Sequence, residues 1–315
     1  MRVAFLFAGQ FRPIDRYLID QSLSILVKDI DYSIFSFCWE ETSKSLNHSN
    51  KPPKLSKVEN ISSTIEEYFS GYNLENYNYE SFLNFKANLP NDVKNIFYSK
   101  KFHSGTVNSI PQLYTIYKCF NLLQNSKNTF DLIFRCRYDS LFLHPLNIYP
   151  LKKIYESNKL YNLNFGRAYY PFRVYDIFFG GSYKAMSFFS DLWNEIPFLV
   201  NNKFDNGLDQ RDCCRLIYLS AKNNYIKTKS FKSRICDIYR NQNNYIYEKY
   251  LIKSHLISLK ISSESIKSIK FYFNWFLNQG LPISNLFLYI LFFLIKLPLS
   301  YLKRIRYLNI LINSN

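Results

Sequence analysis

Histidine is scarce in this sequence, and the cysteines do not follow a metal-binding pattern. Four histidines are scattered along 315 residues, too few and too far apart for a zinc site. The six cysteines are widely separated except for the adjacent pair Cys213 and Cys214, so neither a disulfide framework nor a CxxC site is present. We therefore interpret them as reduced thiols of a cytosolic protein.

Several sequence motifs with a known mechanism are also missing. The chain has no GxGxxG, so a dinucleotide-binding fold is poorly supported. It has no P-loop, no HExxH and no ordered Ser/His/Asp set. The first residues enter a strand pattern directly, with no signal peptide, and we expect a cytoplasmic protein.

Negative charge is in deficit, and the formal net charge is +16. Such a charge favours a polyanionic partner, which can be nucleic acid, an anionic membrane surface or a phosphorylated small molecule. The chain has no compact Lys/Arg-rich run and no zinc-finger spacing. Nucleic acid is therefore the weakest of the three, and we expect no nucleic-acid partner.

The composition is that of a globular protein, with 47% hydrophobic and 20% charged residues. We predict one large domain over residues 1–260 and a C-terminal tail over 261–315. No apolar run reaches the roughly 20 residues that span a bilayer, but residues 286–295 are wholly apolar and precede Lys303, Arg304 and Arg306. This pattern favours a helical anchor on an anionic membrane surface, and a buried C-terminal helix is the alternative.

The most informative stretch is DLIFRCRYD, residues 131–139. Its apolar start predicts a buried strand, and Arg135, Arg137 and Asp139 follow at the strand end. Alternation places these three on one face, and ligands of open α/β sheets bind at strand ends. An acid beside guanidinium groups suits a metal-bound or arginine-clamped diphosphate. The alternative is a surface Arg–Asp pair at a strand end.

Two other strand ends carry candidate ligand contacts. Residues 1–8 predict a buried strand that breaks at Gly9, so Gln10 and Arg12 lie on the following loop, where phosphate or base contacts are made. A tight turn with solvated side chains is the alternative. Asp176 precedes a second apolar strand that ends in two glycines, which let the backbone approach a ligand or simply form a strand-to-helix turn.

The remaining pattern alternates helices and strands, which is typical of an α/β fold. The expected helices cover residues 17–28, 58–69 (capped at Ser62 or Ser63), 108–124 (with Pro111 in the first turn), 182–193 and 207–221. Gln112, Tyr114 and Lys118, on the third of these helices, could touch a ligand, with packing in the core as the preferred interpretation for Tyr114. Strands are expected at 31–39, 225–229 and 233–239, and a strand and loop at 160–170. A loop is expected at 42–57, and an irregular insertion with a short helix at 72–102.

Three of these segments, taken together, resemble a known enzyme family. They are FAGQFR (7–12), DLIFRCRYD (131–139) and DIFFGGSYKAM (176–186). In order and spacing they are similar to bacterial glycosyltransferases of surface polysaccharides, of the WavE lipopolysaccharide-synthesis type, and to related capsular enzymes. The resemblance covers about residues 1–220 and implies a GT-A-like, Rossmann-type mixed sheet flanked by helices.

The resemblance also implies roles for single residues. The strand-end acid of such enzymes acts as the DxD motif and binds the diphosphate of a nucleotide-sugar through Mn²⁺ or Mg²⁺, a role that falls here on Asp139. This chain has R-x-R-x-D instead of D-x-D, so Arg135 and Arg137 could neutralise the diphosphate themselves. The catalytic base would be Asp209, with Asp176 and Asp212 as alternatives.

The expected activity is therefore glycosyl transfer from a nucleotide-sugar. The acceptor would be a growing lipopolysaccharide, capsule or other surface glycan, in the form of a lipid-linked oligosaccharide. The basic, apolar tail would hold the enzyme at the inner face of the bacterial cytoplasmic membrane. A non-catalytic membrane-peripheral scaffold of polysaccharide assembly and a phosphosugar transferase are the alternatives.

Overall fold

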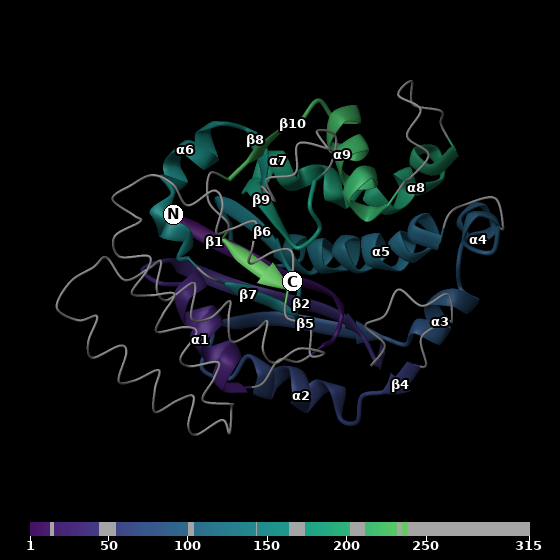
Figure 1. Ribbon diagram of the computed structural model, residues 1–315, viewed down its shortest axis with the longest axis horizontal. Helices are drawn as coiled ribbons and strands as arrows, with labels where there is room; N and C mark the ends of the chain where they lie inside the picture. Colours follow the sequence, from purple (N-terminus) through teal and green to yellow (C-terminus); the bar gives the residue numbers. More distant parts are fainter. Residues whose placement is uncertain are drawn as a thin grey trace, which may run out of the picture. The chain divides into compact units, whose positions relative to one another are not determined.

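A seven-stranded mixed sheet, in the order β10-β8-β9-β6-β1-β2-β5, forms the centre of the structure (Figure 1). The computed structural model describes residues 1–12, 16–43, 55–99, 104–142, 144–163, 174–201, 212–231 and 235–238. The strands of the sheet are β1 (Arg2–Gln10), β2 (Asp31–Trp39), β5 (Leu74–Glu80), β6 (Leu132–Cys136), β8 (Lys159–Asn162), β9 (Phe178–Ser182) and β10 (Lys227–Ser230).

Most strand pairs of this sheet are parallel, and β9 is antiparallel to both of its neighbours. Two antiparallel pairs lie outside it: β3 (Glu41–Ser43) with β4 (Leu55–Lys57), and β7 (Ser140–Phe142) with β11 (Cys236–Ile238). The helices are α1 (Arg16–Leu26), α2 (Ile61–Tyr68), α3 (Phe82–Ala87), α4 (Asn91–Phe97), α5 (Ser104–Gln124), α6 (Leu151–Glu156), α7 (Tyr183–Met186), α8 (Leu192–Asn201) and α9 (Cys213–Asn223). The predicted α/β class, a mixed sheet flanked by helices, is confirmed.

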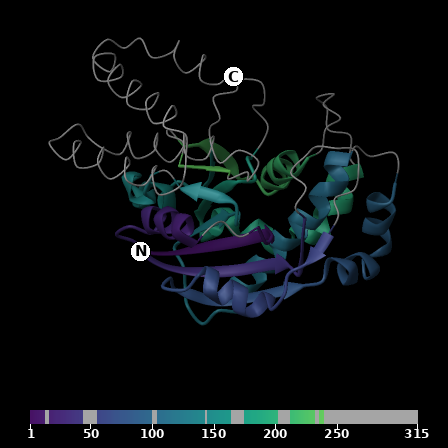
Figure 2. The same cartoon turned by 60° about the horizontal axis from the view of Figure 1, so that its bottom comes forward.

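The two faces of the sheet bury separate sets of side chains, because neighbouring residues of a strand point in opposite directions. Ala4, Leu6 and Ala8 of β1 pack under α5, α8 and α9. Val3, Phe5 and Phe7 of the same strand pack against α1 and α2. Strands buried on both faces have near-continuous apolar sequences, which is why β1 and β2, side by side in Figure 2, were recognisable from the sequence.

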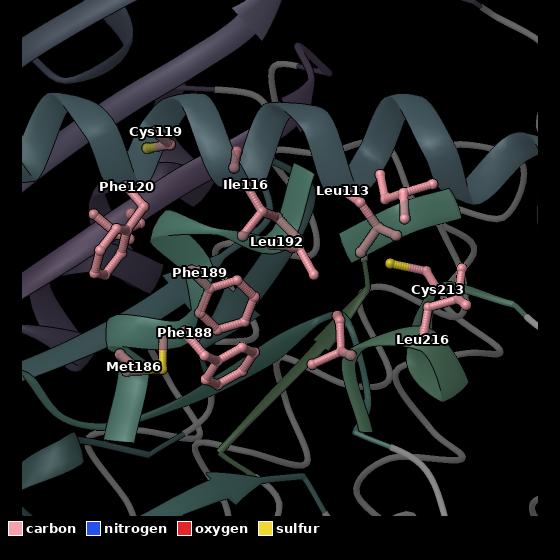
Figure 3. Close-up of a cluster of buried hydrophobic side chains, with 14 of the residues drawn as sticks. Leu113, Ile116, Cys119, Phe120, Met186, Phe188, Phe189, Leu192, Cys213 and Leu216 are labelled. Carbon is pink, nitrogen blue, oxygen red and sulfur yellow. The ribbon is translucent and has the colours of Figure 1, made fainter. Parts of the chain in front are cut away.

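The core beneath α5 shows how the sequence covers one face of the sheet. Figure 3 shows apolar side chains of α5 facing those of the chain from α7 to α9. All of them are at most 5% exposed. The labelled members are Leu113, Ile116, Cys119, Phe120, Met186, Phe188, Phe189, Leu192, Cys213 and Leu216.

The chain reverses direction across the sheet next to β1. It moves from β1 through α1 to β2, and then past α2 to β5, which takes it toward one edge. It then returns through α5 to β6, on the other side of β1. Since crossovers between parallel strands are right-handed, α1 and α5 lie on opposite faces. The point between β1 and β6 is therefore a topological switch point, where open α/β sheets bind ligands.

Several elements differ from the sequence-based predictions. The predicted irregular insertion at 72–102 contains β5, a strand of the main sheet that was not expected, and two short helices, α3 and α4, where one short helix was expected. The sequence of β5, LENYNYE, is mostly polar and its side chains are at most half-buried, so this strand lacks the apolar pattern of a buried one. The predicted loop at 42–57 contains the paired ends β3 and β4.

Two helix starts were also predicted wrongly. α2 begins at Ile61 after Asn60, which adopts a left-handed conformation (φ 47°) and makes no side-chain capping hydrogen bond, so Ser62 and Ser63 are not caps. α5 begins at Ser104, which places Pro111 in the helix interior and not in its first turn. The predicted helix over 182–193 is broken into α7, a 3₁₀ turn at Ser187–Ser190, and α8.

The glycine pair lies within β9 and serves strand pairing. A Cβ on Gly180 would lie 2.2 Å from the carbonyl oxygen of Ile133 in β6, and one on Gly181 would lie 2.5 Å from that of Lys159 in β8. Of the two alternatives for these glycines, close approach to a ligand is therefore not supported, because neighbouring strands occupy the space. The strand passes directly into a helix as the other alternative expected, since Ser182 ends β9 and caps α7. The predicted terminal strands near 225–229 and 233–239 are confirmed as β10 and β11.

The C-terminal tail and the predicted boundary at residue 260 lie outside the described residues. The described residues all belong to one compact unit, Met1–Asn244. Within these described ranges, no helix is long and apolar enough to cross a membrane.

The close approach at Gly180 predicts a severe effect of a single methyl group. Gly180→Ala should lower the free energy of unfolding by about 3 kcal/mol or more, since backbone atoms of β6 must move. Gly71→Ala is the matched control: it has a positive φ (+84°) but no heavy atom within 4 Å of the added Cβ, and should cost about 1–2 kcal/mol. Urea unfolding of both variants measures the difference, and equal losses would contradict the packing at Gly180.

Candidate functional site

Charged side chains gather at the carboxyl ends of β1 and β6, at the switch point of the sheet. β1 ends at Gln10 and β6 ends at Cys136, and the antiparallel strand β9 begins beside that end, opposite Cys136. Three chain segments that are far apart in sequence therefore meet here: the loop after β1, the turn after β6 and the residues before β9. We call the side chains of Arg12, Arg135, Arg137, Asp139 and Asp176 the charged cluster.

Arg137 joins both acids of the charged cluster. Its Nε and Nη2 donate to Oδ1 and Oδ2 of Asp139, each at 2.7 Å, in a bidentate ion pair. Its Nη1 donates to Oδ2 of Asp176 at 3.3 Å. The side chain of Asp139 is 6% exposed and that of Arg137 is 21% exposed. The surface Arg–Asp pair that the sequence left open is therefore excluded, because this pair is largely buried.

Asp176 is held from two further sides. The side-chain amide of Gln112, on α5, donates to its Oδ2. The Sγ of Cys214, at the start of α9, donates to its Oδ1 at 3.4 Å. Both carboxylate oxygens are thus engaged, which favours a positioning role for this acid over proton transfer. Its predicted role as a catalytic base stays a prediction.

The loop after β1 reaches Asp139 from the opposite side. Nη1 of Arg12 lies 3.6 Å from Oδ2 of Asp139, and its Nη2 donates to Oε1 of Gln10 at 2.6 Å. Gly9 adopts a positive φ (+128°), which side chains rarely tolerate. The strand break predicted at Gly9 is wrong, because β1 continues through Gln10, which pairs with Trp39 of β2. Gln10 and Arg12 nevertheless lie at the site, beside the turn that follows β6.

Arg135 is the most deeply buried cation of the cluster, with an exposed fraction of 1%. Its Nη2 donates to the backbone carbonyl of Ala8 at 3.1 Å. Its Nε and Nη1 have no hydrogen-bond partner among the described residues. A Cβ on Gly9 would lie 3.8 Å from Nη2 of this guanidinium. Arg135 is thus anchored at one nitrogen and has unused donors at two.

Buried tyrosines hold the turn that carries Arg137 and Asp139. The strand ends at Cys136, and Ser140 N donates to the carbonyl of Arg137 at 3.1 Å to close the turn. The hydroxyl of Tyr138 donates to the Phe7 carbonyl at 3.1 Å, and the hydroxyl of Tyr68 donates to the Tyr138 carbonyl at 2.6 Å. The predicted alternation is confirmed for Tyr138, which points to the α1 and α2 face.

The neighbouring charges keep both acids ionised. Burial alone would raise the pKa of Asp139, but the attraction and hydrogen bonds of Arg137, with Arg12 and Arg135, bring the pKa below its usual value. The pKa of Asp176 is likewise lowered, because Arg137, Arg135 and the hydrogen bonds it accepts outweigh burial. Burial lowers the pKa of Arg135, whereas the two acids raise that of Arg137 despite its burial.

The donor set of the cluster does not fit a hard divalent cation. Both oxygens of Asp139, the predicted metal ligand, accept hydrogen bonds from Arg137. Two further guanidinium groups, of Arg12 and Arg135, act on the same carboxylate. In the part of the chain that the structure describes, no three His, Cys, Asp or Glu side chains come together as a possible metal site. Mn²⁺ or Mg²⁺ binding at Asp139 stays a prediction without support from the geometry.

The structure brings together nearly all residues that the sequence singled out. Asp209 lies outside the described residues, and Asp212 caps α9 by accepting a hydrogen bond from the backbone N–H of Arg215 at 3.0 Å. Cys214 and Tyr68 had no local sequence signal, since both act through long-range contacts. The predicted residues that lie together are Gly9, Gln10, Arg12, Arg135, Arg137, Asp139 and Asp176.

The lowered pKa of Asp139 predicts a pH-dependent stability. An acid whose folded pKa is depressed stabilises the fold above its unfolded pKa of about 4, and this stabilisation is lost as the pH falls through the folded pKa. Asp139→Asn should therefore reduce the unfolding free energy by about 3 kcal/mol at pH 7 and weaken its dependence on pH below 4. The exposed Asp191→Asn is the control. Urea unfolding between pH 3 and 7 that gives parallel curves for wild type and Asp139→Asn would contradict the ion pair.

No family model matches the sequence, and no curated protein matches it. Among solved structures, the chain is similar to mouse xyloside xylosyltransferase 1 in its apo form, with a TM-score of 0.38 and 9% sequence identity over 73% of this chain and 84% of that chain. The functional proposal therefore rests on the geometry of the site.

Proposed function

We propose that the protein is a glycosyltransferase that takes a sugar from a nucleotide-sugar donor. The observation that carries the proposal is the charged cluster, placed at the switch point between β1 and β6. Its three guanidinium groups outnumber its two carboxylates by one positive charge. A diphosphate is a ligand that such a buried, arginine-rich site complements, because guanidinium groups bind phosphate oxygens in a bidentate manner.

The chemistry of glycosyl transfer matches this arrangement. The bond between the anomeric carbon and the diphosphate oxygen breaks, and its electron pair stays on the leaving nucleoside diphosphate. Fixed cations stabilise that developing charge. The acceptor hydroxyl forms the new bond and, in an inverting enzyme, loses its proton to a carboxylate base. We place this base at Asp209 in preference to Asp176, whose two oxygens are engaged.

The acceptor and the cellular location are further parts of the proposal. A growing lipopolysaccharide, capsule or other surface glycan, presented as a lipid-linked oligosaccharide, would be the acceptor. Two features of the sequence support this acceptor and location. In the tail, an apolar run at 286–295 precedes basic residues, and the net charge of the chain is +16. Both features suit a cytoplasmic enzyme that is peripheral to an anionic membrane surface.

A thermal-shift screen against UDP-, GDP-, CMP- and dTDP-sugars, each with and without Mn²⁺, tests the proposal. A ligand that binds only the folded protein adds about 2.7 kcal/mol of stability at 100 times its Kd. We expect one nucleotide class to raise the Tm, and release of the free nucleotide when an acceptor is added. No shift with any of them would favour a non-catalytic scaffold, and a product that retains phosphate would indicate a phosphosugar transferase.

A pair of arginine variants locates the binding site on the sheet. Arg12→Gln removes a cation of the charged cluster, and should weaken binding of the active nucleotide roughly tenfold or more. Arg2→Gln is the matched control, since Arg2 starts the same strand at its opposite end and pairs there with Asp31 and Glu75. Equal affinities of the two variants, measured by calorimetry, would place the nucleotide elsewhere.

A further inference from the structure

The two arginines of the R-x-R-x-D segment have opposite surroundings. All three guanidinium nitrogens of Arg137 donate to a carboxylate oxygen, two to Asp139 and one to Asp176. Arg135 has only the Ala8 carbonyl as a partner, and makes no ion pair within the described residues. Two side chains that are two residues apart and chemically identical therefore perform different tasks.

The state of Arg135 is unfavourable for folding. A buried charge is stabilised only if it is paired and its hydrogen bonds are made, and Arg135 is 1% exposed with two nitrogens unpartnered. Burial accordingly lowers its pKa. The nearby Asp176 offsets part of this cost, but it accepts no hydrogen bond from Arg135, and an anion that reached Nε and Nη1 would satisfy these two donors. Two donors of a buried guanidinium are thus left without a partner at this position.

The backbone of β1 prepares the place for such an anion. The Ala8 carbonyl fixes Nη2 of Arg135, which orients the guanidinium at the end of the strand. The next residue is Gly9, and a Cβ there would lie 3.8 Å from that same nitrogen. A side chain larger than glycine would therefore occupy space next to the guanidinium, which glycine leaves open.

A divalent cation at Asp139 would disturb this arrangement. A metal ion would have to share or displace the bidentate fork of Arg137, whose side chain is largely buried. Displacement would leave a second buried guanidinium without its partner, at a large energetic cost. The two hydrogen bonds from Arg137 instead mean that Asp139 fixes the position of the Arg137 guanidinium.

We propose that Arg135 binds the diphosphate of the donor directly, without a divalent cation, and that Arg137, Asp139 and Asp176 form a fixed support for it. This inference rests on the proposed function and assigns its anion-binding group. When the sugar leaves, the electron pair of the broken C–O bond remains on the diphosphate, and the N–H groups of Arg135 donate to its oxygens.

Binding of inorganic pyrophosphate to the full chain, measured by calorimetry in EDTA and then in Mn²⁺, tests the assignment. Wild type should bind in EDTA. Arg135→Met should bind roughly 30-fold to 100-fold more weakly. Its urea midpoint without ligand should fall much less than that of Arg137→Met, because Arg135 makes no direct ion pair and supports Asp139 and Asp176 only through its nearby charge. Arg135→Lys, which keeps the charge and loses the fork, should show an intermediate affinity, and Arg2→Met should bind as wild type does.

Arg137→Met supplies the contrast in stability. It removes the partner of two buried carboxylates, so its urea midpoint should fall well below that of wild type. A midpoint for Arg135→Met that falls as far would overturn the proposal, because Arg135 would then be a structural residue. Arg135→Lys gives a second, independent test: if it binds pyrophosphate as tightly as wild type, the guanidinium group is not needed for binding and the proposal is also overturned.

The outcomes separate this inference from the proposed function. If wild type binds pyrophosphate and a nucleotide-sugar only when Mn²⁺ is present, the metal-free assignment fails and the glycosyltransferase proposal stands. If Arg135→Met binds pyrophosphate in EDTA as tightly as wild type, the anion lies elsewhere and the assignment fails. If wild type binds neither pyrophosphate nor any nucleotide-sugar, both fail.

Discussion

The ion pairs of Arg137 with Asp139 and Asp176 determine how the rest of the site is arranged. They join the turn after β6 to the residues before β9, and through Asp176 they reach Gln112 of α5 and Cys214 of α9. A pair buried to this extent is stabilising only while it is complete, since loss of one partner leaves an uncompensated charge. The network therefore keeps β6, β9, α5 and α9, which are far apart in sequence, in a fixed relation around the end of β1.

The topology of the sheet explains why these charges meet at this place. The chain leaves β1 in one direction and returns to β6 in the other, so the helices that follow lie on opposite faces and the strand ends lie between them. Gly9, at the end of β1, keeps side-chain atoms away from Arg135. The ion-paired residues Arg137, Asp139 and Asp176 thus lie next to Arg135, which has two donors without a partner. That combination is what a site for an anionic leaving group requires.

The apolar strands and the residues of the site could be predicted from the sequence. The different roles of Arg135 and Arg137 could not. The strand at 31–39 was predicted with its observed bounds because apolar residues alternate along β2, whereas β5 was missed because its residues are polar and half-buried. The residues at the ends of β1 and β6 were predicted because parallel strands end at the same edge. The different surroundings of Arg135 and Arg137 depend on a turn that begins after Cys136, and on contacts with α5 and α9. No periodicity in the sequence encodes those contacts.

The central claim is that Arg137 and Asp139 act as one structural unit, and a double-mutant cycle tests it most directly. The unfolding free energies of wild type, Arg137→Met, Asp139→Asn and the double variant would be measured in urea at pH 7. If the two residues support each other, the double variant should be less destabilised than the sum of the single variants, by about 2–3 kcal/mol. Additivity within about 0.5 kcal/mol would show that the pair is not coupled. Arg137 would then be as available to an anion as Arg135, and the proposed division between them would be wrong.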